Sequence, residues 1–164
     1  MVARPTLLKG YVYDKHLLAE DEPIFSGDRI EAVITIEAKN NYEYLLFEDL
    51  KPAGLEAVEV RSGQPLYAQE LKSGAVSRKV NEKTGTQEGA DHTGRTRWVY
   101  QELRDRKVAL FIDKLPEGVW QIRYDLRAET PGAFHALPVV GHAMYVPEIR
   151  ANGTEARIKV EDKP

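Results

Sequence analysis

The chain has 164 residues, of which 42% are hydrophobic and 30% charged, with a formal net charge of −3. This composition is typical of a globular chain with a real core, and we expect a single domain over residues 1–164. The charge gives no reason to expect nucleic-acid binding, which usually needs a basic face. The absence of cysteine excludes disulfides, thiolate metal sites and cysteine nucleophiles.

The sequence predicts no membrane span, because no apolar run approaches the ~20 residues that a bilayer requires. The N-terminus, MVARPTLLKGYVYDKH, lacks the long apolar segment of a signal peptide. Two interpretations of the compartment follow. The protein is cytoplasmic, or the chain belongs to a longer exported protein.

Strand patterns run along most of the chain, and no window of 11 residues has the apolar stripe of a helix. Leu8, Tyr11 and Tyr13 fall in a first extended segment. The clearer strands are expected at 28–38, 42–48, 98–103, 107–113, 119–127 and 156–161. Alternation places on the core side Ile30, Ala32, Ile34, Ile36 and Ala38, then Val108, Leu110 and Ile112, then Trp120, Ile122, Tyr124 and Leu126.

Turn signals separate these strands. Pro52 and Gly54 end the dense run YEYLLFE, and residues 55–60 lead away from it. Further on, a turn at Thr130-Pro131-Gly132 leads to an extended segment at 134–138, and the pattern closes on residues 143–148. Seven to nine strands with regular turns predict an all-β fold, an antiparallel β-sandwich.

Residues 61–97 differ from the rest of the chain. Only eight of these 37 residues are apolar, while eleven are charged and five are glycine. A structureless loop of this length is unusual in a compact domain. We therefore expect a long exposed insertion or hairpin at 61–97, with short strands at 66–68 and 76–80; a solvated loop without a role is the simpler alternative.

The motifs of common catalytic sites are missing: the sequence has no phosphate loop, GxGxxG, GxSxG or HExxH. His135 and His142 have no acidic residue between them, so we expect ordinary surface or half-buried histidines and no metal site. Glu48 and Asp49 should point to opposite faces of a strand, which argues against an acid–base pair. We expect no enzyme and no cofactor; a glycan hydrolase would need a deep cleft with two carboxylates ~5–10 Å apart.

Met144 and Tyr145 allow two interpretations. The pair follows a Gly141-His142 break and precedes Pro147, and its spacing alone favours packing in the core. The alternative is a contact surface for a partner, because methionine adapts its shape and tyrosine offers a large area with a polar tip.

Three segments together resemble the C-terminal macroglobulin-like domain of bacterial alpha-2-macroglobulins, and Gly27–Ile30 also fits. The segments are YLLFEDLKPAGLEAV at 44–58, RDRKVALFIDKLPEGVW at 104–120 and YDLRAETPGAFHALPVVGHAMYVPE at 124–148. Their most specific parts are Glu48-Asp49 with 52–55, 126–128 with Pro131-Gly132, and 143–145 with Pro147-Glu148. The resemblance covers roughly residues 6 to 162.

This resemblance implies an immunoglobulin-like, macroglobulin β-sandwich without catalytic activity, from a protease-trapping inhibitor of the bacterial periplasm or cell envelope. In that family a protease cleaves a bait region, and a Cys-to-Gln thioester in a helical domain then attaches the protease covalently. The C-terminal domain covers the thioester beforehand. The family pair that matches Met144 and Tyr145 helps to shield the thioester from water, which implies an interdomain contact here.

The implied partners are the thioester domain and the other macroglobulin domains of a parent chain, and target proteases through the whole protein. This chain has no cysteine, so it carries no thioester itself. It is either one domain of a longer protein or a free-standing relative. The alternative function is a free-standing binding or adhesion module that acts through the 61–97 loop, since loops on rigid scaffolds often carry binding.

Overall fold

The computed structural model describes residues 2–6, 12–19, 22–58, 66–72 and 92–163, with residues 2–6 and 12–15 considered as backbone only. Within these ranges every regular element is a strand, so the all-β prediction is confirmed. The strands are β1 (Val2–Thr6), β2 (Val12–His16), β3 (Pro23–Phe25), β4 (Arg29–Ala38), β5 (Tyr42–Asp49), β6 (Leu55–Ala57), β7 (Leu66–Leu71), β8 (His92–Leu103), β9 (Val108–Leu115), β10 (Gly118–Ala128), β11 (Gly132–Ala136), β12 (Val140–Ala143), β13 (Arg150–Asn152) and β14 (Ala156–Glu161). No helix among the described residues could cross a membrane.

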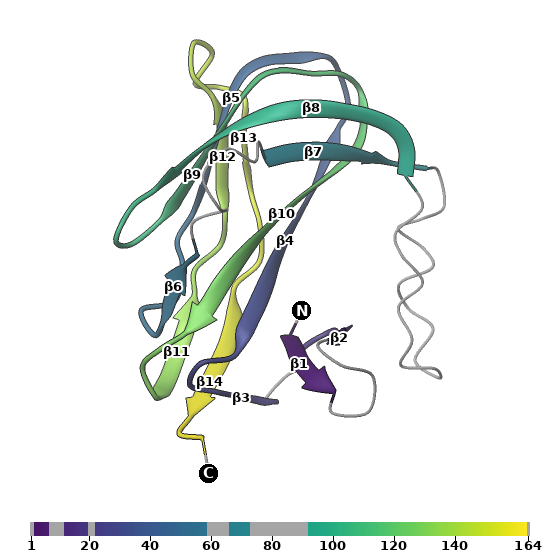
Figure 1. The fold of residues 1–164 in the computed structure, drawn as a ribbon. Helices are drawn as coiled ribbons and strands as arrows, with labels where there is room; N and C mark the ends of the chain where they lie inside the picture. Colours follow the sequence, from purple (N-terminus) through teal and green to yellow (C-terminus); the bar gives the residue numbers. More distant parts are fainter. Residues whose placement is uncertain (1, 7–11, 20–21, 59–65, 73–91, 164) are drawn as a thin grey trace.

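One long curled sheet makes most of the sandwich (Figure 1). Its strands follow the order β13-β12-β5-β9-β8-β7-β10-β4-β1-β2, and β6 also pairs with β10. A second sheet has the order β11-β14-β3. All pairs are antiparallel except β14 with β3, which is parallel.

Strand β8 pairs with strands of both layers of the sandwich. Its residues up to Val99 pair with β7, and its residues from Tyr100 onward pair with β9. The strand bends strongly across the top of the molecule (Figure 1). Both layers of the sandwich are therefore parts of one hydrogen-bonded sheet.

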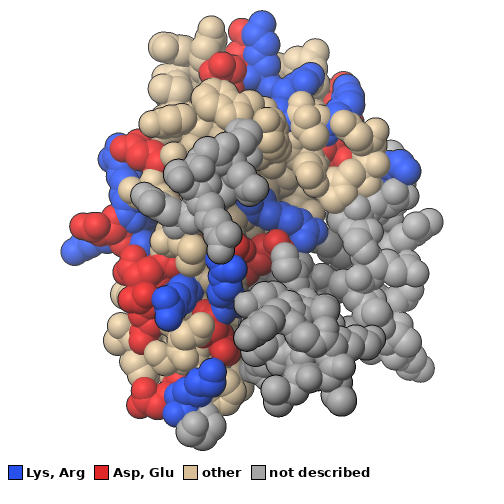
Figure 2. Space-filling model, in the orientation of Figure 1, with Lys and Arg blue, Asp and Glu red and all other residues tan. Residues whose placement is uncertain are grey.

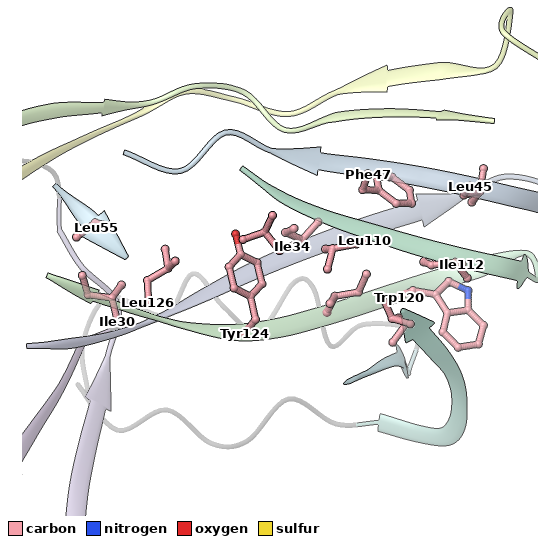
Figure 3. Close-up of a cluster of buried hydrophobic side chains, with 14 of the residues drawn as sticks. Ile30, Ile34, Leu45, Phe47, Leu55, Leu110, Ile112, Trp120, Tyr124 and Leu126 are labelled. Atoms are coloured by element: carbon pink, nitrogen blue, oxygen red, sulfur yellow. The ribbon is translucent and has the colours of Figure 1, made fainter. Parts of the chain in front are cut away.

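The core lies between β4 and β10 on one side and β5 and β9 on the other (Figure 3). The alternation predicted for β4, β9 and β10 is confirmed, because every residue assigned to the core side is buried there or packs against the buried cluster. Trp120, Ile122 and Leu110 are fully buried. Each such side chain contributes roughly 1.5–3 kcal/mol through burial of apolar surface.

Several segments differ from the sequence expectations. Strands β3 and β13 were not predicted, because each has only three residues and lacks a visible alternation. Strand β8 begins at His92 rather than Trp98, and β7 reaches Leu71, so parts of 61–97 belong to the main sheet. Leu8, Tyr11 and the expected strand at 76–80 lie outside the described residues, as do 61–65 and 73–91.

Candidate interdomain contact site

A tight turn joins β12 to β13 and carries Met144 and Tyr145. The Ala143 amide donates to the Ile149 carbonyl at 3.0 Å, and the Ile149 amide donates to the Val146 carbonyl at 3.0 Å. Pro147 stands at the second position of this inner turn, where its fixed φ is favourable. The turn forms the tip above β5 and β12 in Figure 1. Residues 143–148 are therefore the last residue of β12 and the turn that follows it.

Met144 and Tyr145 both point into solvent: 46% of Met144 and 74% of Tyr145 is exposed. The interpretation that spacing alone favoured, packing in the core, is wrong. The reason is that β12 ends at Ala143, so the alternation that would have placed one of the two side chains inward stops there.

The two residues belong to a larger apolar group that we call the turn patch: Tyr44, Met144, Tyr145, Val146 and Ile149, all exposed. The rings of Tyr44 and Tyr145 meet edge to face, with centroids 5.1 Å apart and planes at 86°. This is a preferred geometry for an aromatic pair. Exposed large apolar side chains that cluster in this way mark contact surfaces more often than isolated ones do.

Tyr44 has an unusual backbone. Its φ of 53° lies in the left-handed region, and it is the one described residue other than glycine with a positive φ. The chain needs this distortion because Tyr42 packs against the core and Leu45 is buried in it. Residues three apart cannot share a face of a regular strand. A left-handed conformation costs an L-residue about 1–2 kcal/mol.

A hydrogen bond to β5 and close packing of β12 on β5 hold the turn in place. The Met144 amide donates to the Tyr44 carbonyl at 2.8 Å, which ties the turn to β5. On β12, a Cβ at Gly141 would lie 2.6 Å from the Phe47 ring, so only glycine permits this approach. A small cleft of about 120 Å³ opens beside the turn and includes Ile149 and Tyr42 in its wall.

A larger cleft, of about 640 Å³, has carboxylates in its wall: Glu31, Asp49 and Glu155. Two of them are engaged in the structure. Asp49 accepts a hydrogen bond from the Tyr124 hydroxyl, and Glu31 pairs with Arg123 at 3.0 Å. Burial raises the pKa of Asp49, and the Tyr124 hydrogen bond partly opposes this shift.

The candidate metal and acid–base residues are kept apart. His135 lies on β11 in the three-stranded sheet, whereas His142 lies on β12 in the long sheet. Glu48 pairs with Lys107, and Asp49 turns to Tyr124. In the part of the chain that the structure describes, no three His, Cys, Asp or Glu residues form a group suited to a metal ion.

Residues 11–148 match the family model of the bacterial alpha-2-macroglobulin MG10 domain. The chain belongs to this family. The resemblance found in the three sequence segments is thereby confirmed. No curated protein matches the chain.

Solved alpha-2-macroglobulins share the fold of this MG10 domain. Salmonella alpha-2-macroglobulin reacted with methylamine aligns over 84% of this chain with a TM-score of 0.58 and 25% identity, which is 8% of that chain. Native Escherichia coli alpha-2-macroglobulin, spanning domain MG7 to the C-terminus, aligns over 84% with a TM-score of 0.58 and 24% identity, which is 20% of that chain. The MG10 domain thus spans a small part of these relatives.

The sequence pattern points to Met144 and Tyr145 but gives no indication that Tyr44 is their neighbour. An unbroken strand over YEYLLFE would place Tyr42 and Tyr44 on one face. The sequence carries no signal of the break, because Tyr42, Tyr44 and Leu46 keep a period of two and Leu45 and Phe47 are apolar as well.

Proposed function

We propose that this MG10 domain is the non-catalytic C-terminal part of a bacterial alpha-2-macroglobulin-like protease trap. In this proposal the turn patch packs on the thioester domain of the parent chain and keeps water from the thioester. Met144 and Tyr145 make the contact. The parent protein works in the periplasm or cell envelope. Its target proteases are partners of the whole protein rather than of this domain alone.

The observation that carries the proposal is the exposure of Met144 and Tyr145 on a hydrogen-bonded turn. The hydrogen bonds of the turn order the backbone that carries these side chains before a partner binds, which lowers the entropy that binding costs. A thioester survives only where water is excluded, and apolar side chains provide that exclusion. The small cleft beside Ile149 gives the same surface a hollow for an apolar side chain of the partner.

The surface charge is compatible with a protein partner. Lys, Arg, Asp and Glu side chains are interspersed on the left and lower part of the face in Figure 2, while its upper part carries many uncharged side chains with some charged ones among them. The family to which the chain belongs consists of domains within long chains, which favours this proposal over a free-standing adhesion module acting through residues 61–97.

The test replaces Met144 or Tyr145 by alanine in the full-length parent protein and follows spontaneous thioester hydrolysis. We expect Tyr145→Ala to speed hydrolysis about tenfold, because loss of a contact worth about 1.4 kcal/mol exposes the bond ten times more often. Met144→Ala should act in the same direction. The release of the free thiol over time measures the rate.

Tyr67→Ala is the matched control. Tyr67 is 44% exposed on β7, which lies four strands from β12 in the long sheet, and its removal should leave the rate unchanged. Tyr145→Phe should also keep the bond protected, since the ring rather than the hydroxyl covers it. Unchanged hydrolysis in Met144→Ala and Tyr145→Ala would refute the shielding role.

A further inference from the structure

The backbone of Tyr44 is strained at the place where its side chain meets Tyr145. Residues held in rarely populated conformations persist only where the surrounding structure requires them, and they cluster at functional sites. Asparagine and glycine adopt the left-handed region more readily than an aromatic residue does. A tyrosine at this position therefore calls for a reason that lies in its side chain.

The strand next to β5 has a matching irregularity. On β9, Ile112 and Leu115 are both buried, while Asp113 and Lys114 between them are exposed. The register between the strands is constant across this point, with Glu43 opposite Lys114 and Leu45 opposite Ile112. Both strands thus turn two successive residues outward together, and the distortion lifts Tyr44 to the tip of the sandwich.

Tyr44 contacts the turn through its backbone and through its side chain. Its carbonyl accepts the Met144 amide at 2.8 Å, and its ring meets the Tyr145 ring edge to face at 5.1 Å. Tyr145 itself is 74% exposed. Among the described residues, Tyr44 provides the one aromatic ring in contact with Tyr145, so removal of that ring would leave Tyr145 without an aromatic neighbour.

We infer that Tyr44 is a positioning residue for the contact surface: its strained backbone and its ring hold Tyr145 in the orientation that covers the partner domain. This inference rests on the proposed function of the turn patch. It adds a third residue, from a strand that lies 100 positions away in the sequence, to a pair that is contiguous in the chain. The Tyr44 ring acts through Tyr145 and the Met144 backbone rather than on the thioester.

The experiment uses the full-length parent protein with Tyr44→Asn and Tyr44→Phe. Asparagine tolerates a positive φ but removes the ring, whereas phenylalanine keeps both the ring and the strain. We expect Tyr44→Asn to speed thioester hydrolysis roughly three- to tenfold, the range that corresponds to a lost aromatic pair. Tyr44→Phe should hydrolyse at the wild-type rate.

A double substitution separates positioning from a general structural effect. In the Tyr145→Ala background, Tyr44→Asn should add no further acceleration, because there is no ring left to position. Undiminished acceleration in that background would overturn the inference. So would a Tyr44→Asn protein with wild-type hydrolysis while Tyr145→Ala hydrolyses faster.

Hydrogen exchange at the turn distinguishes this inference from the proposed function. Tyr44→Asn should accelerate amide exchange in the peptide that contains Met144 and Tyr145, and Tyr44→Phe should not. If Tyr145→Ala leaves hydrolysis unchanged, the shielding proposal fails, and faster exchange in Tyr44→Asn still supports positioning of Tyr145. Unchanged exchange in Tyr44→Asn would refute positioning whatever the thioester does.

Discussion

Single residues with unusual surroundings decide where the domain is sensitive to pH. Asp49 is a half-buried carboxyl whose partner is the Tyr124 hydroxyl. Burial raises the pKa of both groups, so Tyr124 remains a phenol that donates to Asp49. The raised pKa of Asp49 means that the folded state disfavours its charge. The contribution of Asp49 to stability is therefore present at acidic pH and is lost as the pH rises through its folded pKa.

Asp49→Asn should accordingly raise the unfolding temperature of the chain at neutral pH. The amide keeps an oxygen acceptor for Tyr124 and removes the buried charge. The gain should shrink as the pH falls through the raised folded pKa of Asp49, and it should be lost below the ordinary aspartate pKa of about 3.9, where Asp49 is neutral in both the folded and the unfolded state. Thermal unfolding of both proteins between pH 4 and pH 7 checks this sign, and Tyr124→Phe should have the opposite effect at neutral pH. A neutral-pH loss in Asp49→Asn would contradict the account.

Elements are joined by a polar network on the side of the molecule where β7, β8 and β10 meet. The Glu70 carboxylate lies on β7 and accepts from Thr93 and Arg95 of β8. Arg95 and Arg97 lie over the Trp120 ring of β10, at 5.6 and 5.7 Å from its centroid. The Arg95 hydrogen bond holds the pKa of Glu70 below its usual range, so the pair stays ionised at neutral pH.

Gly118→Ala should break this network. Gly118 has a φ of 146°, and a Cβ there would lie 2.6 Å from the Glu70 carboxylate. We expect a loss of about 1–3 kcal/mol in the free energy of unfolding, measured by urea denaturation. Gly27→Ala is the matched control, because Gly27 also has a positive φ, of 91°, but no atom lies within 4 Å of its Cβ position. An equal loss in the two variants would assign the whole effect to backbone strain.

Elements with a strong period could be predicted from the sequence, and local distortions could not. The buried faces of β4, β9 and β10 follow directly from alternation. Strand β3 depends on its parallel neighbour β14, which is 136 positions from it at Pro23 and Lys159, so no local pattern reveals it. The left-handed backbone at Tyr44 arises because Tyr42 and Leu45, on either side of it, both pack in the core. The exposure of Tyr145 follows from where β12 ends, and short strands end where tertiary contacts decide.

The whole molecule is a curled sheet whose corner strand, β8, links the two layers. The turn patch stands at one end of this sandwich, and the three-stranded sheet with β14 lies toward the other (Figure 1). Such a domain can contact a partner domain through the turn patch and separate from it by rigid-body movement, without a change in its own fold. In the proposed protein, cleavage elsewhere needs only to weaken that one contact to expose the thioester.

The central claim is that this MG10 domain works inside a much longer protease-trapping chain. The most direct measurement is the size of the native gene product, detected with an antibody against this domain in fractionated cells. The account predicts a periplasmic or envelope band many times larger than 18.6 kDa. A soluble cytoplasmic band near 18.6 kDa would contradict it, because a free-standing domain without cysteine has no thioester for Met144 and Tyr145 to shield.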